Sequence, residues 1–203
     1  MFYEMARGIV SALFHVCFSI QIMGKENIPS EKGGYIIASN HVSNNDPPMV
    51  GVVFKGKYTF MAKEELFKIN RVFTWLITKL GAFPVKRGSK DMSVLNKAIE
   101  SLKHGRIFVI FPEGTRSKTG ELGKPKSGVS LIAAKAKAPV VPVFIKYGKK
   151  RPLRRKVLVS IGEIISAEHF ADIDINNKQH IRLVSEKIMG EISKLKETAP
   201  EIK

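Results

Sequence analysis

Short apolar runs alternate with amphipathic segments along most of this chain, and this alternation predicts its secondary structure. Runs rich in β-branched and aromatic residues and bounded by polar or turn residues are typical of buried strands, and they cover residues 34–39, 58–62, 106–111, 140–145 and 156–161. Segments of helical character cover residues 49–54, 67–80, 91–102, 127–138 and 178–196. Strands that alternate with helices predict an α/β fold with a mixed or mainly parallel central sheet flanked by helices.

Two residues qualify this pattern locally. Pro142 lies inside the run 140–145, and because proline lacks a backbone N–H, it predicts an edge strand or a bulge. Ser127 precedes the segment 128–138 and is a candidate N-cap.

The N-terminal segment 8–23 is apolar and carries no formal charge. It is shorter than the ~20 residues that span a bilayer, and Ser11, His15, Ser19 and Gln21 interrupt it at near-helical spacing. A cleaved signal peptide fits poorly, since there is neither a basic start nor a small-residue cleavage site. We therefore expect residues 1–23 to form a membrane-associating helix that lies in the interface, and residues 24–203 to form one domain. A helix packed on the protein's own core is the alternative.

A polar cluster, Asn40 to Asp46, follows the strand predicted over residues 34–39. Asp46 suits an N-cap and Pro47 the first position of a helix. His41 on the intervening turn could act as a general base that the Asp46 carboxylate orients. Their spacing of five does not place them on one helical face, so Asp46 would fold back from the helix start. An ordinary capped helix start remains the alternative.

A second polar cluster, residues 112–117, follows the strand predicted over 106–111. Gly114 permits a tight turn and a close approach of backbone N–H groups to an anion. Arg116 supplies fixed positive charge, and Glu113 could accept hydrogen bonds from a hydroxyl or orient a basic neighbour. Because both clusters follow apolar strands, we expect them to share one site at one edge of the sheet.

Two sequence motifs give the chain a family resemblance. NHVSNND matches the NHxxxxD motif, and FPEGTRS the motif of the same sequence, of the glycerolipid acyltransferases, which include 1-acyl-sn-glycerol-3-phosphate acyltransferases. Weaker family blocks match residues 81–87 and 140–143. The resemblance as a whole runs from about residue 24 to about residue 162.

The resemblance implies where an acceptor would bind. Glu113, Gly114, Thr115 and Arg116 match the motif that holds the glycerophosphate acceptor, and Arg87 matches the arginine of a weaker block. Lys63, at a predicted strand end, is a candidate phosphate ligand; a solvated surface lysine is the alternative. The segment 67–80, which includes Trp75, would be a core helix or part of an acyl-binding wall.

The charge balance points to anionic partners. The 203 residues include 34 Lys and Arg against 18 Asp and Glu, a net charge of +16, and the segment 146–156 holds seven basic residues and no acid. Anionic lipid, an acidic acyl carrier and nucleic acid all qualify. Zinc-ligand spacing, an RNP-like aromatic pattern and a Walker motif are lacking, so we expect no nucleic-acid partner. The single cysteine, Cys17, excludes an internal disulfide.

The family resemblance implies an enzyme that moves a fatty acyl group from an acyl carrier protein or coenzyme A thioester to the sn-2 hydroxyl of 1-acyl-sn-glycerol 3-phosphate (lysophosphatidic acid), making phosphatidic acid. No G-x-S-x-G elbow is present, so we expect direct transfer without an acyl-enzyme. We expect no metal or cofactor, and a location on the cytoplasmic face of a membrane. The alternatives are glycerol 3-phosphate or an amino-acid lipid as acceptor and, more distantly, a basic binding protein without catalysis.

Overall fold

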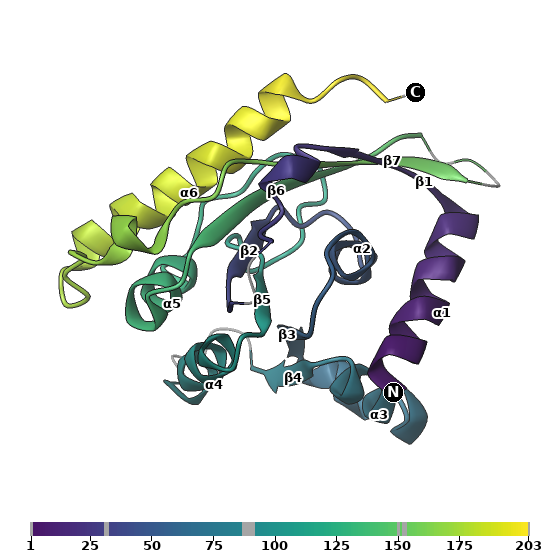
Figure 1. Cartoon of the computed structure of the whole chain (residues 1–203), viewed down its shortest axis with the longest axis horizontal. Coiled ribbons are helices and arrows are strands. Elements are labelled where there is room, and N and C mark those ends of the chain that lie inside the picture. The colour runs from purple at the N-terminus through teal and green to yellow at the C-terminus, as the bar shows by residue number, and fades with distance from the viewer. Residues whose placement is uncertain (1, 31–32, 87–91, 150, 152–153, 203) are drawn as a thin grey trace.

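A seven-stranded sheet forms the centre of the protein (Figure 1). This computed structural model describes all residues except 1, 31–32, 87–91, 150, 152–153 and 203. The strand order is β1-β7-β6-β2-β5-β3-β4. The strands are β1 Phe18–Met23, β2 Ile36–Ser39, β3 Tyr58–Lys63, β4 Ala82–Val85, β5 Ile107–Ile110, β6 Val140–Tyr147 and β7 Arg155–Ile161. All neighbours pair in parallel except β6 and β7, which are antiparallel, so the predicted α/β class with a mainly parallel sheet is confirmed.

Helices cover both faces of this sheet. They are α1 Phe2–Cys17, α2 Asp46–Val53, α3 Arg71–Lys79, α4 Met92–Lys103, α5 Gly128–Ala136 and α6 Lys178–Thr198, with short 3-10 turns η1 Lys25–Asn27, η2 Glu64–Lys68 and η3 Ala167–Phe170. One apolar core lies under α4, α5 and α6, and the other lies under α1 and α2 (Figure 1). Ile36 and Ile37, adjacent in β2, are fully buried in opposite cores. This double burial explains why the central strands are continuous apolar runs.

The N-terminal segment differs from the prediction. The helix ends at Cys17, and residues Phe18–Met23 form β1, which pairs in parallel with β7. Ser19 and Gln21, taken as a polar stripe on a helix, are the solvent side of an edge strand, whereas Phe18, Ile20 and Ile22 pack on the core. A period of two therefore applies over these six residues. Within the described residues, none of the helices has the length and apolar content needed to cross a bilayer.

Two smaller expectations are also corrected. Pro142 is buried in β6, an interior strand, so an edge position is wrong. The alternative, a bulge, is present. β6 pairs Val143 with Ile161 and Val140 with Ile165, so the segment that follows β7 contains one more residue than β6 between these two pairs. Ser127 precedes α5 but makes no side-chain capping bond.

The α3 segment is not a core helix, because it contains no buried residue.

The helix after the first motif begins at Asp46 itself, with Asn45 as the N-cap residue. Asp46 therefore occupies the first helical position rather than the cap, and Pro47 the second.

Gly24 closes the turn after β1 and provides a test of how β1 is held. Its φ is +70°, and a Cβ atom there would lie 2.0 Å from the carbonyl oxygen of Ile161, at the end of β7. We expect Gly24→Ala to lower the free energy of unfolding by about 2 kcal/mol or more. Gly8→Ala is the matched control, since Gly8 lies in α1 with open space around it and should gain about 0.5–1 kcal/mol. Denaturant unfolding measures both, and equal effects would contradict this view of the turn.

Candidate active site

Neighbouring parallel strands bring the two polar clusters together. β2 pairs with β5, with Ala38 opposite Ile110, so the clusters that follow both strands emerge at the same carboxyl edge of the sheet. The main-chain N–H of Ser117 donates to the carbonyl of His41 at 2.8 Å. The expected meeting of the two clusters at one edge is therefore what the structure shows.

His41 and Asp46 form a hydrogen-bonded dyad. His41 Nδ1 lies 2.7 Å from Asp46 Oδ2, and the Asp46 side chain is fully buried. The same oxygen accepts the main-chain N–H groups of Val42 and Ser43, each at 2.7 Å. The turn thus folds around the carboxylate, and Asp46 reaches back from the helix start as its spacing requires.

This dyad defines the chemistry available at His41. A carboxylate only accepts, so Nδ1 must carry the donated proton, and Nε2 of the neutral ring is then an acceptor. Within the described part of the chain Nε2 has no hydrogen-bond partner, and the side chain is 14% exposed. The ring stacks on Phe111 with centroids 4.1 Å apart and planes at 19°, which fixes its orientation. An oriented imidazole with an accessible, unprotonated nitrogen is equipped to act as a general base.

Tyr147, which the sequence did not single out, holds the other side of the carboxylate. Its hydroxyl donates to Asp46 Oδ1 at 2.8 Å. Burial, and then the adjacent Asp46 carboxylate, raise the pKa of Tyr147 well above its ordinary value, so the hydroxyl stays a donor. The Arg155 guanidinium lies over the Tyr147 ring, 5.0 Å from its centroid, and the Phe18 ring meets it edge-on with centroids 6.1 Å apart. The signal available was position: a tyrosine at the end of a strand adjacent to β2 reaches the same edge.

Two buried polar side chains fix the position of the His41 turn. Asn40 donates through Nδ2 to the Ile145 carbonyl at 3.0 Å, and its Oδ1 accepts the Ile145 N–H at 2.7 Å. Glu113 Oε1 accepts the main-chain N–H of His41 at 3.0 Å, and Oε2 accepts that of Gly123 at 2.9 Å. Both side chains are buried. Glu113 thus aligns the two clusters, and a direct contact with substrate stays a prediction.

Two residues of the second cluster face solvent. Thr115 and Arg116 are exposed. Gly114 has φ +69°, and a Cβ atom there would lie 2.7 Å from Nζ of Lys126. Lys126 is a further cation beside this cluster, which the sequence did not single out. Because Gly114 has no side chain, it leaves room for the side chain of Lys126.

The other predicted phosphate ligands lie further along the edge or outside the described residues. Lys63 is the exposed last residue of β3, which pairs with β5, so it lies on the same edge as both clusters. Arg87 falls within the residues that the structure does not describe. Binding roles for Lys63 and Arg87 stay predictions.

Comparison with known proteins agrees with this geometry. A family model described as "Acyltransferase" matches residues 19–146. The chain belongs to this acyltransferase family. A 1-acyl-sn-glycerol-3-phosphate acyltransferase from Streptococcus pneumoniae is 32% identical over 97% of this chain and 74% of that protein. One from Bacillus subtilis is 30% identical over 95% of this chain and 96% of the relative. The crystal structure of PlsC, the corresponding acyltransferase from Thermotoga maritima, matches 99% of this chain and 81% of that one, with TM-score 0.75 and 30% identity.

A polar cavity of about 400 Å³ opens beside the His41 turn in this acyltransferase. Val42, Ser43 and Tyr147 form part of its wall, and its charged lining residues are Glu121, Lys146, Arg155 and Lys196. Cations therefore outnumber acids next to the dyad. Among the described residues, no cluster of three or more His, Cys, Asp and Glu side chains is arranged to hold a metal ion.

The hydroxyl of Tyr147 can be removed with little change in shape, which tests its support of Asp46. We expect Tyr147→Phe to lower the acyl-transfer kcat about tenfold, because the buried carboxylate loses one of its donors. The KM for the acceptor should change little, since the hydroxyl acts through Asp46 and His41 rather than on the substrate. Tyr35→Phe is the control, a buried tyrosine at the opposite end of β2. A kcat equal to that of the control would contradict a positioning role.

Proposed function

We propose that this protein transfers a fatty acyl group from an acyl thioester to the sn-2 hydroxyl of 1-acyl-sn-glycerol 3-phosphate, making phosphatidic acid. The observation that carries the proposal is the His41–Asp46 hydrogen bond of 2.7 Å. It leaves Nε2 without a hydrogen-bond partner among the described residues, at the edge shared with Arg116. The printed names of the relatives from S. pneumoniae and B. subtilis support this choice of acceptor.

The chemistry follows from the dyad. Nε2 of His41 takes the proton of the acceptor hydroxyl while its oxygen attacks the thioester carbonyl carbon. Asp46 holds the ring in the required tautomer and stabilises the imidazolium that forms. The tetrahedral intermediate collapses, the carbon–sulfur bond breaks, and the leaving thiolate takes the proton from the imidazolium. A thioester is already activated, so direct transfer needs neither an acyl-enzyme nor a metal or cofactor.

The acceptor phosphate would bind among the cations of the same edge. Arg116 offers a planar guanidinium that can form paired hydrogen bonds to a phosphate. Lys63, Lys126 and Arg87 would add charge around it, and the left-handed turn at Gly114, next to Thr115, would let main-chain N–H groups approach. The exposed positions of Thr115 and Arg116 leave both side chains accessible to an arriving substrate.

The substrate lies in a membrane, and helix α1 offers a surface for reaching it. Met5, Ile9, Leu13 and Val16 are each more than half exposed and form one stripe along α1. We propose that this stripe lies in the bilayer interface on the cytoplasmic face, with the basic segment 146–156 near anionic headgroups or an acidic acyl carrier. Such a contact needs no membrane-spanning helix.

The acceptor has one specific competitor. A lyso-ornithine lipid O-acyltransferase from Pseudomonas aeruginosa is 34% identical over 54% of this chain, and its name suggests an amino-acid lipid as acceptor. Glycerol 3-phosphate is a further alternative. A panel of these acceptors with radiolabelled acyl-carrier-protein and coenzyme A thioesters identifies both substrates. Phosphatidic acid as the main product supports the proposal, whereas product from another acceptor alone would keep the chemistry and reject the substrate.

Replacing the proposed base tests the mechanism. We expect His41→Ala to lower kcat about 10²–10⁴-fold while the acceptor KM changes little, because general-base catalysis is lost and binding is not. Asp46→Asn should also lower kcat strongly, since the amide no longer fixes the tautomer. His104→Ala is the control, an exposed histidine after α4. Wild-type activity in folded His41→Ala would reject the assignment.

Arg116 tests the phosphate site separately. We expect Arg116→Gln to raise the KM for lysophosphatidic acid roughly tenfold or more, because a charge-assisted phosphate contact is lost, and to change kcat much less. Arg182→Gln serves as the control, since Arg182 is an exposed arginine on α6 paired with Glu186. Equal KM values for the two variants would remove Arg116 from the binding site.

A further inference from the structure

Helix α3 and the turn before it expose an apolar surface that the acyl-transfer mechanism does not use. Leu66, Ile69, Val72 and Trp75 recur every three residues and are 37%, 57%, 76% and 50% exposed. We call these four residues the η2–α3 surface. No residue of η2 or α3 is buried, so the apolar side of this amphipathic stretch does not pack in the protein core. A surface of this kind marks a contact with a partner.

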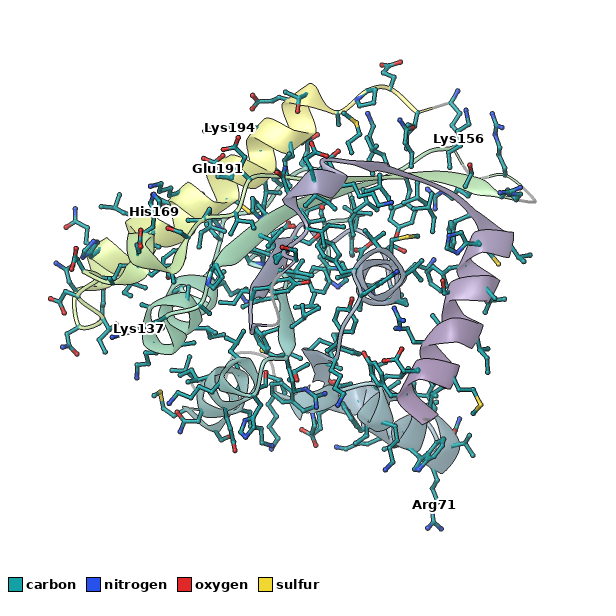
Figure 2. All side chains as sticks on the ribbon, in the orientation of Figure 1. Arg71, Lys137, Lys156, His169, Glu191 and Lys194 are labelled. Carbon is teal, nitrogen blue, oxygen red and sulfur yellow. The ribbon has the colours of Figure 1, made fainter. Side chains whose placement is uncertain are left out.

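Cations accompany this surface. A hollow of about 370 Å³ lies between η2 and α3, with Phe67 and Trp75 in its lining and Lys68 and Arg71 beside them. Arg71 points away from α3 at the lower end of the molecule (Figure 2). Lys68 pairs with Glu64 at 2.7 Å. Apolar side chains next to Lys and Arg match a bilayer that contains anionic lipid, where acyl chains lie beneath charged phosphates.

The η2–α3 surface also belongs to the same part of the fold as the start of α1. The hydroxyl of Tyr3, in the first turn of α1, accepts the Tyr58 N–H at 3.2 Å. Gly81, two residues after α3, packs so closely on Tyr58 that a Cβ atom there would lie 2.0 Å from its carbonyl oxygen. One residue of β3, Tyr58, therefore contacts both the first turn of α1 and the turn that follows α3.

We propose that the η2–α3 surface enters the interface of an anionic bilayer as a second contact in addition to α1. The net charge of +16 favours an anionic lipid surface over a second copy of this chain, which would carry the same charge. The proposal extends the membrane association proposed above, but it does not depend on the acyl-transfer reaction. Vesicle binding and acyl transfer can therefore fail separately.

Trp75 is the only tryptophan of the chain and lies in this surface, so its fluorescence reports directly on the contact. We expect vesicles of phosphatidylcholine with about one third phosphatidylglycerol to shift the emission to shorter wavelength, and bromine-labelled lipid to quench it. Vesicles of phosphatidylcholine alone should give a smaller effect. Cosedimentation measures binding independently of fluorescence. Vesicle binding with unchanged, unquenched emission overturns the proposal, and so does an absence of vesicle binding.

A double variant separates this surface from α1. We expect Ile69→Ser with Val72→Ser to weaken vesicle binding roughly fivefold or more and to reduce the quenching of Trp75. Leu183→Ser is the control, because Leu183 is 56% exposed on α6. The α1 variant Ile9→Ser with Leu13→Ser should weaken binding too, but at saturating lipid Trp75 should still be quenched. Binding by the double variant equal to that of the control overturns the proposal.

Discussion

The buried carboxylate of Asp46 is the constraint on which the site depends. A fully buried charge must be compensated, and Asp46 receives hydrogen bonds from His41, Val42, Ser43 and Tyr147. Three of these donors belong to the turn before α2, and the fourth comes from the end of β6. The turn, the helix start and the strand end must therefore assemble together, and the orientation of the imidazole follows from that assembly. The same hydrogen bonds therefore compensate the charge of Asp46 and orient His41 as a base.

The same logic holds one layer further out. Asn40 uses both ends of its amide on the backbone of β6, and Glu113 uses both oxygens on main-chain N–H groups of two different loops. Each is a buried polar side chain that is satisfied only when segments far apart in sequence are correctly placed. Asn40 of the first motif and Glu113 of the second thus fix the position of the His41 turn. Arg116, which is exposed, remains available for a ligand.

Much of this arrangement was accessible from the sequence, for identifiable reasons. The strands carrying both motifs are buried on two faces, so their apolar runs are unambiguous, and the carboxyl ends of parallel neighbours must meet. The contact between His41 and Asp46 is local, which is why the residue types of a single turn suggested it. Tyr147 lies 101 residues from Asp46, and only the order of the strands places it there. β1 was missed because its six residues continue an apolar helical run, and only pairing with β7 distinguishes the two periods.

The direction of β7 has a mechanical consequence. Because β7 alone runs against its neighbour β6, and β1 follows β7, helix α1 ends at the carboxyl edge of the sheet, level with the dyad. Phe14 lies 5.3 Å from Phe18, and Phe18 lies 6.1 Å from Tyr147, whose hydroxyl binds Asp46. A short row of aromatic rings therefore runs from α1 to the carboxylate. Any force that pulls α1 away from the sheet must either open this row or displace the tyrosine that supports the base.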